Sequence, residues 1–444
     1  MTDIKITERT LYMSSLWQDE ISLPRFQSLE GDISTDVLII GGGMAGIMVA
    51  LELRRRGISY ILVEKDRICG GTTHNTTAKI TAQHGLVYHR IANRYGLGAA
   101  KAYLEANLKA IDRYTELCRD IDCDFEQKDN YVYTLDSLDV LNSEMAVLKR
   151  IGYPAELRCG LPLPLDTVGA VRFPAQAQFN PLKFVAAVAK DLNIYEHTFV
   201  KNVSNGVAVT HHGKIRAKKT VVATHFPFMD RFGGYFLKMY QHRSYVIALR
   251  GAYIPDGMYV DDSGTGLSFR SYGELLLLGG GGHRTGKNGG GWEYLRKTAE
   301  KAYKGSEETH HWATQDCMTL DEIPYIGRYC SLTPDLYVAT GFNKWGMTSS
   351  AVAAEVLADA LTDKKNKYEQ LFAPQRNIFT RQLWANIGES ALNLVRPTAP
   401  RCTHLGCALT WNSTEHTWDC PCHGSRYSED GKVIDNPSTK NLKR

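Results

Sequence analysis

The sequence predicts an α/β protein that carries a small, separate module at its C-terminal end. A short apolar run at 35–40, rich in β-branched residues, is typical of a buried parallel strand. A glycine-rich turn, a helical stretch to about Arg56 and a second apolar run at 58–63 follow it. Four of the ten cysteines lie in the last 43 residues. Alternating strand and helix patterns favour layered α/β architecture, and the cysteine-rich tail indicates a distinct unit.

The glycine-rich turn at 41–46 reads Gly-x-Gly-x-x-Gly, and Glu64 ends the second apolar run. Between a strand and a helix, with an acid at the end of the next strand, this order predicts a Rossmann-type dinucleotide site. Gly41 would allow the tight turn, Gly43 the approach of the pyrophosphate, and Gly46 close helix–strand packing. Glu64 would accept hydrogen bonds from ribose hydroxyls and disfavour the 2′-phosphate of NADP. A glycine-rich turn without a ligand is the structural alternative.

The tail contains Cys-x-His at 402–404 and Cys-x-x-His at 420–423. Two cysteines and two histidines form the ligand set of a Rieske [2Fe–2S] centre, in which both histidines bind the same iron. Cys402 and Cys420 would hold the inner iron, and His404 and His423 the outer one. A structural zinc site is the alternative, because this residue set also suits zinc. Zinc would leave the two further cysteines of the tail without a role.

These tail residues resemble the Rieske proteins of the respiratory-complex type. The resemblance implies a disulfide between Cys407 and Cys422 that clamps the two cluster loops together. It also implies that Ser425 and Tyr427 donate hydrogen bonds to cluster and ligand sulfurs, which raises the reduction potential. The alternative for both is an ordinary loop residue. The tail is shorter than a full domain of that type, so we expect a minimal module.

Three segments of the remaining chain resemble the D-amino-acid oxidase superfamily. They are Gly70-Gly71-Thr72-Thr73 with its continuation to 79, the run 219–225 together with Val200, and the stretch 321–348, which leads into a helix. The resemblance implies FAD, with the N-terminus of the last helix facing the flavin N1 and O2 edge. The cofactor contacts implied by the turn and the resemblance are Gly41, Gly43, Met44, Ala45, Gly46, Glu64, Lys65, Gly71, Thr72, Thr73, Thr77, Ala78, Val200, Ala223, Thr224, Gly341, Trp345, Gly346, Met347 and Thr348.

The expected fold is therefore α/β: an FAD-binding Rossmann-type domain with an interleaved mixed-sheet substrate domain, plus a small all-β Rieske-type C-terminal module. The expected boundaries are an N-terminal arm at 1–34, an oxidoreductase domain at 35–371, a linker at 372–396 and the Rieske module at 397–444. The substrate domain would be inserted at roughly 91–150 and 235–308. With both segments in one chain, the sequence resembles bacterial FAD-dependent oxidoreductases that have a C-terminal Rieske module.

Composition narrows the partners and the location. A net charge of +4 over 444 residues is too small to indicate nucleic-acid binding. No run reaches the roughly 18 apolar residues of a membrane span, and the N-terminus has no apolar signal core. We therefore expect a cytoplasmic protein whose other six cysteines are isolated thiols.

By resemblance, the expected substrate is an amine or an amino-acid-like molecule, oxidised by FAD. Electrons would pass from FAD through the Rieske cluster to an external acceptor. Arg270 and Arg243 are candidates for a clamp on a substrate carboxylate, although a surface arginine or a structural ion pair is the more common role. His84, His225 and His283 are candidate pocket residues or structural histidines. Two alternatives remain open: an electron-transfer reductase that serves a partner enzyme, and a simple flavin oxidase with a zinc-stapled tail.

Overall fold

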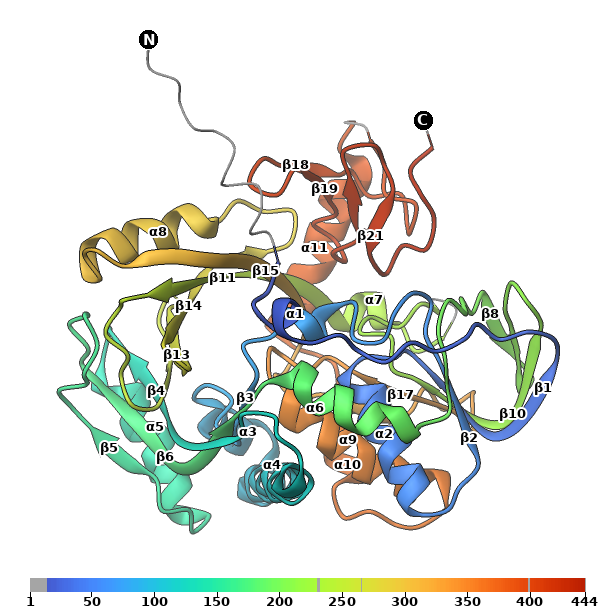
Figure 1. Cartoon of the computed structure of the whole chain (residues 1–444), viewed down its shortest axis with the longest axis horizontal. Coiled ribbons are helices and arrows are strands. Elements are labelled where there is room, and N and C mark those ends of the chain that lie inside the picture. The colour runs from blue at the N-terminus through green and yellow to red at the C-terminus, as the bar shows by residue number, and fades with distance from the viewer. Residues whose placement is uncertain (1–13, 230–231, 265, 398–399, 444) are drawn as a thin grey trace.

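A computed structural model describes residues 14–229, 232–264, 266–397 and 400–443 (Figure 1). Residues 1–13 of the predicted N-terminal arm lie outside this range. The described part of the arm begins with helix α1 (Trp17–Glu20), whose Trp17 is buried against the rest of the protein. The indole Nε1 of Trp17 donates a hydrogen bond to the carbonyl oxygen of Thr76 at 2.8 Å, so the arm packs onto a predicted cofactor segment.

The first sheet has eight strands and is the predicted dinucleotide-binding sheet. Its main path runs β16-β17-β10-β1-β2-β7, and β8 and β9 extend it beside β10. The central strands pair in parallel and end in buried apolar residues, as strands covered on both faces do. Helices α2 (Met44–Arg55) and α9 (Gly346–Leu361) pack against each other on this sheet. The strand bounds are β1 Ile33–Ile40, β2 Tyr60–Val63, β7 Ile194–Tyr195, β8 Asn202–Ser204, β9 Val207–Val209, β10 Lys214–Val222, β16 Tyr325–Arg328 and β17 Leu336–Thr340.

The second sheet has nine strands in the order β15-β11-β14-β13-β12-β4-β6-β3, with β5 beside β6. Its pairs are antiparallel except for the parallel pair β12–β4, so the sheet is mixed. It is wider than the two predicted segments, because β6 and β15 pair along most of their length with β4 and β11. The bounds are β3 Lys79–Ile80, β4 Glu126–Thr134, β5 Glu156–Arg158, β6 Gly169–Gln178, β11 Met239–Arg250, β12 Met258–Asp261, β13 Ser268–Tyr272, β14 Leu275–Arg284 and β15 Glu307–Thr319.

Helices cover the outer sides of the two sheets and connect them. Asn180 caps α6, because its Oδ1 accepts hydrogen bonds from the backbone N–H groups of Leu182 and Lys183. The remaining helices of this part are α3 Val87–Tyr95, α4 Leu97–Leu117, α5 Leu138–Arg150, α6 Pro181–Val188, α7 Tyr235–Lys238, α8 Gly291–Ala302 and α10 Glu369–Phe372, with the 3₁₀ turns η1 Thr72–Asn75, η2 Cys118–Asp120 and η3 Ala189–Asp191.

The C-terminal module contains its own four-stranded antiparallel sheet, although the tail is short. The strands are β18 Thr410–Asn412, β19 Thr417–Asp419, β20 Arg426–Ser428 and β21 Val433–Asp435. Helix α11 (Arg381–Val395) fills most of the predicted linker and lies beside this module (Figure 1). One cysteine-containing loop precedes β18 and the other joins β19 to β20, so both meet at one end of the sheet.

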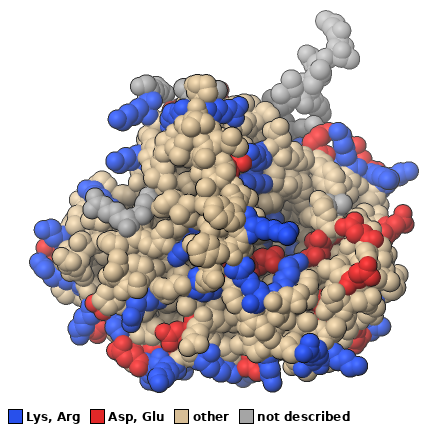
Figure 2. Space-filling view, turned by 180° about the vertical axis from the view of Figure 1, so that it is seen from behind, with Lys and Arg blue, Asp and Glu red and all other residues tan. Residues whose placement is uncertain are grey.

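Within the described residues, no helix is long and apolar enough to cross a membrane. Lys and Arg side chains are interspersed with Asp and Glu over the face shown in Figure 2. This mixture of charge agrees with the small net charge of the chain.

Candidate functional site

A cavity of about 1300 Å³ lies where the two large sheets and the C-terminal module meet. The glycine-rich turn forms part of its wall, with Gly43 just before the N-terminus of α2. A Cβ atom at Gly46 would collide with the carbonyl oxygen of Gly41, so Gly46 lets the helix pack directly under the turn. The backbone N–H of Met44 donates to the hydroxyl of Thr73 at 3.0 Å, which joins the turn to the second predicted cofactor segment. This cradle fits a dinucleotide phosphate group.

Glu64 lies at the end of β2 on the cavity wall. Its carboxylate accepts hydrogen bonds from the backbone N–H groups of Gly42 at 2.8 Å and Asp66 at 3.1 Å. Burial raises the pKa of Glu64, while these two donors oppose the rise. In a Rossmann-type site, the acidic residue at the end of the second strand accepts hydrogen bonds from the ribose, and Glu64 lies at this position.

Most of the predicted cofactor contacts line this one cavity. They are Gly41, Gly43, Met44, Ala45, Glu64, Lys65, Gly71, Thr72, Thr73, Thr77, Val200, Ala223, Thr224, Gly341, Trp345, Gly346 and Met347. Gly46, Ala78 and Thr348 lie behind the wall instead. The hydroxyl of Thr348 donates to the carbonyl oxygen of Thr81 at 3.1 Å and is 3.0 Å from His84 Nε2, which fixes the first turn of α9 against the second sheet.

His84 is held in place by neighbours on three elements. Its ring stacks on Trp345, with the ring centroids 5.0 Å apart, and its Nδ1 lies 2.7 Å from the hydroxyl of Tyr103. Burial lowers the pKa of His84 to about 3, so its ring is neutral. His84 therefore supports the segment before α9 and also lines the cavity.

Both arginines predicted as a carboxylate clamp have partners within the protein, although Arg243 also lines the cavity. Arg270 is buried and donates to backbone carbonyl oxygens, including those of Thr77, Ala78 and Phe179. Arg243 forms a buried ion pair with Glu415 of the C-terminal module. Arg270 therefore braces the backbone of the cofactor segment away from the cavity, whereas Arg243 joins two parts of the protein at the cavity wall.

A second polar group on the cavity wall contains Asp316, Lys344 and His242, of which only Lys344 lies in a stretch that the sequence connected with the cofactor, 321–348. Burial lowers the pKa of Lys344 and raises that of Asp316, while the attraction between the two residues opposes both shifts. Burial lowers the pKa of His242 to about 3, and the charge of Lys344 adds to this effect. The pairing of β11 with β15 places His242 opposite Asp316, and the loop before α9 contributes Lys344. Of the predicted histidines, His225 also lines the cavity, whereas His283 is 3.0 Å from the hydroxyl of Tyr245.

The two histidines predicted as cluster ligands face each other in the C-terminal module. The ring centroids of His404 and His423 are 5.0 Å apart, and the rings are nearly perpendicular. His423 is buried, and neither of its ring nitrogens has a hydrogen-bond partner among the described residues. Burial lowers the pKa of His423 to about 3, so the ring is in the neutral form that binds metals. A buried neutral imidazole without a partner fits an iron ligand.

The two cysteines predicted as ligands are buried beside each other in the same module. The neighbouring Cys420 thiol, followed by burial, raises the pKa of Cys402. The hydroxyl of Tyr427 lies 3.3 Å from Cys402 Sγ, while Ser425 Oγ accepts a hydrogen bond from the backbone N–H of Ser438 at 3.0 Å. The donor set of two thiols and two imidazoles is therefore gathered at one end of the small sheet.

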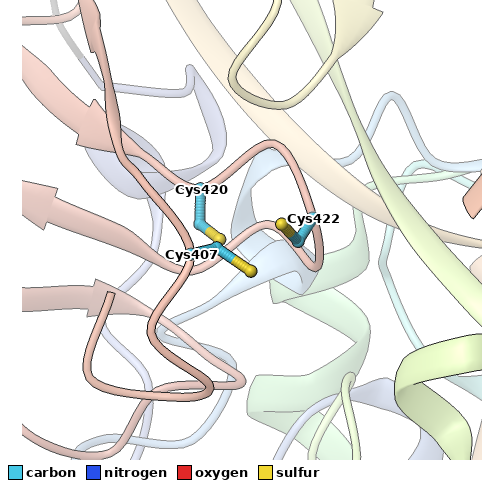
Figure 3. Close-up of side chains that lie close together, drawn as sticks. All are labelled: Cys407, Cys420 and Cys422. Carbon is cyan, nitrogen blue, oxygen red and sulfur yellow. The ribbon is translucent and has the colours of Figure 1, made fainter. Parts of the chain in front are cut away.

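The predicted disulfide between Cys407 and Cys422 is not formed. All ten cysteines, which lie within the described residues, are free thiols. The sulfur atoms of Cys407, Cys420 and Cys422 lie within 4.8 Å of one another (Figure 3). None of these sulfur atoms makes the contact of roughly 2.0 Å that a disulfide bond requires. The prediction is therefore corrected to a cluster of three buried thiols.

Comparison with known proteins agrees with both halves of the site. The family described as FAD dependent oxidoreductase matches residues 36–360, and the Rieske [2Fe-2S] domain matches residues 386–444. The chain is 35% identical to the Bacillus subtilis (strain 168) protein named as a Rieske 2Fe-2S iron-sulfur protein, YhfW, over 96% of each chain. Its tail is 54% identical over 41 residues to the cytochrome b6-f complex iron-sulfur subunit 1 of Nostoc sp., which is 9% of this chain and 23% of that protein.

Solved structures share the fold of the larger part. Glycine oxidase from Geobacillus kaustophilus is similar with a TM-score of 0.64 and 20% identity, over 78% of this chain and 100% of that one. L-amino acid deaminase from Proteus vulgaris is similar with a TM-score of 0.64 and 19% identity, over 80% of this chain and 100% of that one. The matched families imply FAD and a Rieske cluster, and the cradle and the donor set described above fit both groups. The chain therefore belongs to the FAD dependent oxidoreductase family and carries a Rieske [2Fe-2S] domain at its C-terminal end.

Proposed function

We propose that this protein oxidises an amine or amino-acid-like substrate in the cavity and delivers the electrons one at a time, through the cluster, to an external one-electron acceptor. The observation that carries the proposal is that the Rieske module forms part of the wall of the flavin cavity. Its residues Val433 to Asn436 line the same cavity as the glycine-rich turn. A cluster attached in this position can accept the electrons that substrate oxidation releases in the cavity.

In this proposal, the predicted lining residues hold FAD, with the turn around Gly43 at the phosphates and Glu64 at the ribose. Cys402, His404, Cys420 and His423 hold the cluster. When bound, these groups supply a hydride acceptor and a one-electron carrier. Oxidation of the amine to an imine removes two electrons and two protons. The electrons leave in two single transfers to two acceptor molecules, and the protons are released to solvent.

The proposed substrate class is supported by the names of the structural relatives, which include a glycine oxidase, an L-proline dehydrogenase from P. horikoshii and an L-amino acid deaminase. Since Arg270 does not line the cavity and Arg243 is paired with Glu415, we propose that Lys344 meets the substrate carboxylate and that Asp316 meets its amino group. An ammonium and a carboxylate on one wall complement a zwitterion. Both groups line the cavity.

Anaerobic mixing of the purified protein with a panel of amines, amino acids and NADH tests this function. The bleaching of the flavin absorbance band identifies the donor, and electron paramagnetic resonance reports whether the cluster then becomes reduced. We expect an amine or an amino acid to reduce both groups. Reduction by NADH alone would instead support an electron-transfer reductase that serves a partner enzyme.

A further inference from the structure

Two buried glutamines connect the cavity to the cluster loop. Gln315 on β15 lines the cavity, and Gln241 on the neighbouring strand β11 lies behind it. The side-chain amide of Gln315 donates to Gln241 Oε1 at 2.8 Å. The amide of Gln241 in turn donates to the carbonyl oxygen of His423 at 2.8 Å. The pair therefore reaches from the cavity wall to a predicted iron ligand.

Every polar atom of the two side chains is engaged. Gln241 also donates to the carbonyl oxygen of Asn436 at 2.9 Å, and Gln315 also donates to that of Gly424 at 2.9 Å. Gln315 Oε1 accepts from the hydroxyl of Thr285 at 2.8 Å. Gln241 is 1% exposed and Gln315 is 4% exposed. A fully satisfied buried network of this kind holds one geometry, because any other arrangement leaves a polar group without a partner.

The network is also tied to the flavin side. The hydroxyl of Thr72, a predicted cofactor contact, donates to the backbone carbonyl oxygen of Gln315 at 3.3 Å. The side chain of Gln241 lies beside His225, which lines the cavity. Packing is tight on the cluster side, since a Cβ atom at Gly424 would be only 2.5 Å from the Cβ of Gln241. The glutamines thus contact a predicted flavin segment on one side and the His423 loop on the other.

We propose that Gln241 and Gln315 are positioning residues that hold the His423 loop against the cavity wall and carry the contact through which single electrons pass from the flavin side to the cluster. This inference rests on the proposed electron route. In each transfer, one electron leaves the flavin side and reduces the cluster, and the external one-electron acceptor then reoxidises the cluster. No bond forms or breaks in the glutamine pair, and no proton crosses it.

The test uses the full-length protein with both cofactors and three single variants, Gln241→Met, Gln315→Met and Gln178→Met. Methionine keeps the length of the side chain but removes the amide. Gln178 is the matched control, because it is an equally buried glutamine of the same sheet that bonds to Glu126 and Ser271 instead of the module. The bound flavin is photoreduced anaerobically with EDTA as the electron donor, and reduction of the cluster is followed by its absorbance.

We expect cluster reduction to slow about tenfold or more in Gln241→Met and Gln315→Met, as is typical when partners of a metal ligand are removed. Gln178→Met should match the wild type. Hydrogen exchange measured by mass spectrometry should be faster across 420–425 in the two interface variants only. Faster exchange together with slower reduction supports the positioning role. Rates within twofold of the wild type, or an equal loss in Gln178→Met, would overturn it.

Two further outcomes keep the test decisive. If an interface variant loses flavin or iron, Thr285→Val replaces it, because that change removes only the hydroxyl donor to Gln315. We then expect a smaller slowing of cluster reduction in the same direction, and an unchanged rate would contradict the inference. If the wild type itself shows no cluster reduction after flavin photoreduction, the proposed route fails. If the wild type transfers electrons to the cluster and the glutamine variants do so at the same rate, the role of the glutamine pair is rejected and the proposed route stands.

Discussion

Two glycines of the same turn are expected to respond differently to substitution. A Cβ atom at Gly43 would have only Thr73 Oγ1 close by, at 3.4 Å, whereas one at Gly46 would collide with the Gly41 carbonyl oxygen. Gly43→Val should therefore fold but purify without yellow flavin, because its side chain occupies the phosphate cradle. Gly46→Ala should lower the free energy of unfolding by about 1–3 kcal/mol through overpacking. Flavin absorbance and thermal unfolding measure the two effects, and a fully yellow Gly43→Val protein would contradict this assignment.

Replacing one histidine of the tail should change the signature of the cluster. His404→Cys replaces an imidazole ligand by a thiolate, so the electron paramagnetic resonance signal that arises from mixed ligation should shift or disappear. His416→Cys is the matched control, because His416 is an exposed histidine of the same module, in the turn before β19. Two iron atoms per chain are expected in the wild type and the control. A Rieske signal that persists in His404→Cys would show that this residue is not a ligand.

At the level of single residues, the sequence predicted the groups that short motifs define and missed those that tertiary pairing defines. The glycine turn, Glu64 and the tail histidines have fixed local spacing, and the structure places them at the cavity or at the cluster loops. Arg243 could not be assigned in this way, because its partner Glu415 is far away in the sequence and belongs to another sheet. Asp316 on β15 and Lys344 in the loop before α9 come together only through the tertiary fold.

Among the elements, the contact between β11 and the turn after β18 depends on one carboxylate. Glu415 is only 9% exposed, pairs with Arg243 and Arg426 and also accepts a hydrogen bond from the hydroxyl of Tyr245. Burial alone would raise the pKa of Glu415, but the two arginines outweigh it and lower the pKa to about 2. Glu415→Gln would leave both buried guanidinium groups without this counter-charge. We expect it to cost about 3–5 kcal/mol of the free energy of unfolding.

This pairing has a defined dependence on pH. Because the folded pKa of Glu415 is depressed, its stabilisation is complete above the ordinary value of 4.5 and is lost as the pH falls toward about 2. The difference in thermal unfolding temperature between the wild type and Glu415→Gln should therefore be constant at pH 6–7 and shrink below about pH 4.5. Loss of the cluster in acid affects both proteins and cancels in the comparison. A difference that stays the same down to pH 3 would contradict this account.

Helix α11 shows why the element between the two domains was difficult to predict. Its buried positions include Asn386 and Asn393, while Trp384 and Val395 are 66% and 79% exposed. The buried asparagines take part in contacts with Arg284 and with the backbone of Ala408. Hydrophobic periodicity identifies a helix by its apolar buried face. Here the buried asparagine side chains bond to β14 and within the helix itself, so the apolar pattern does not define the packing of this segment, which was predicted as a linker.

For the whole molecule, removing the tail should open the cavity as well as abolish the electron route. A chain that ends at Asn377 keeps the buried ion pair between Arg376 and Asp321 and loses α11 and the module. We expect this variant to bind FAD more weakly, because module residues that line the cavity are gone. After photoreduction of its flavin, the truncated protein should no longer reduce cytochrome c, because it lacks the cluster.

The matched control for this truncation is Cys420→Ser, which removes a cluster ligand but leaves the module in place. It should lose electron delivery to cytochrome c while its flavin stays protected from quenching by iodide. In the truncated chain, iodide should quench the flavin more strongly. Equal protection of the flavin in both variants would mean that the module is not part of the cavity wall.

The close docking of the module bears on what limits turnover. A Cβ atom at Gly286 would lie 2.6 Å from the backbone nitrogen of Pro421, so the loop that carries Cys422 and His423 rests directly on β14 and the turn that follows it. On the proposed route, a cluster docked in this way receives electrons from the flavin without moving. Internal electron transfer should therefore be insensitive to solvent viscosity, and added sucrose should slow only the encounter with the external acceptor.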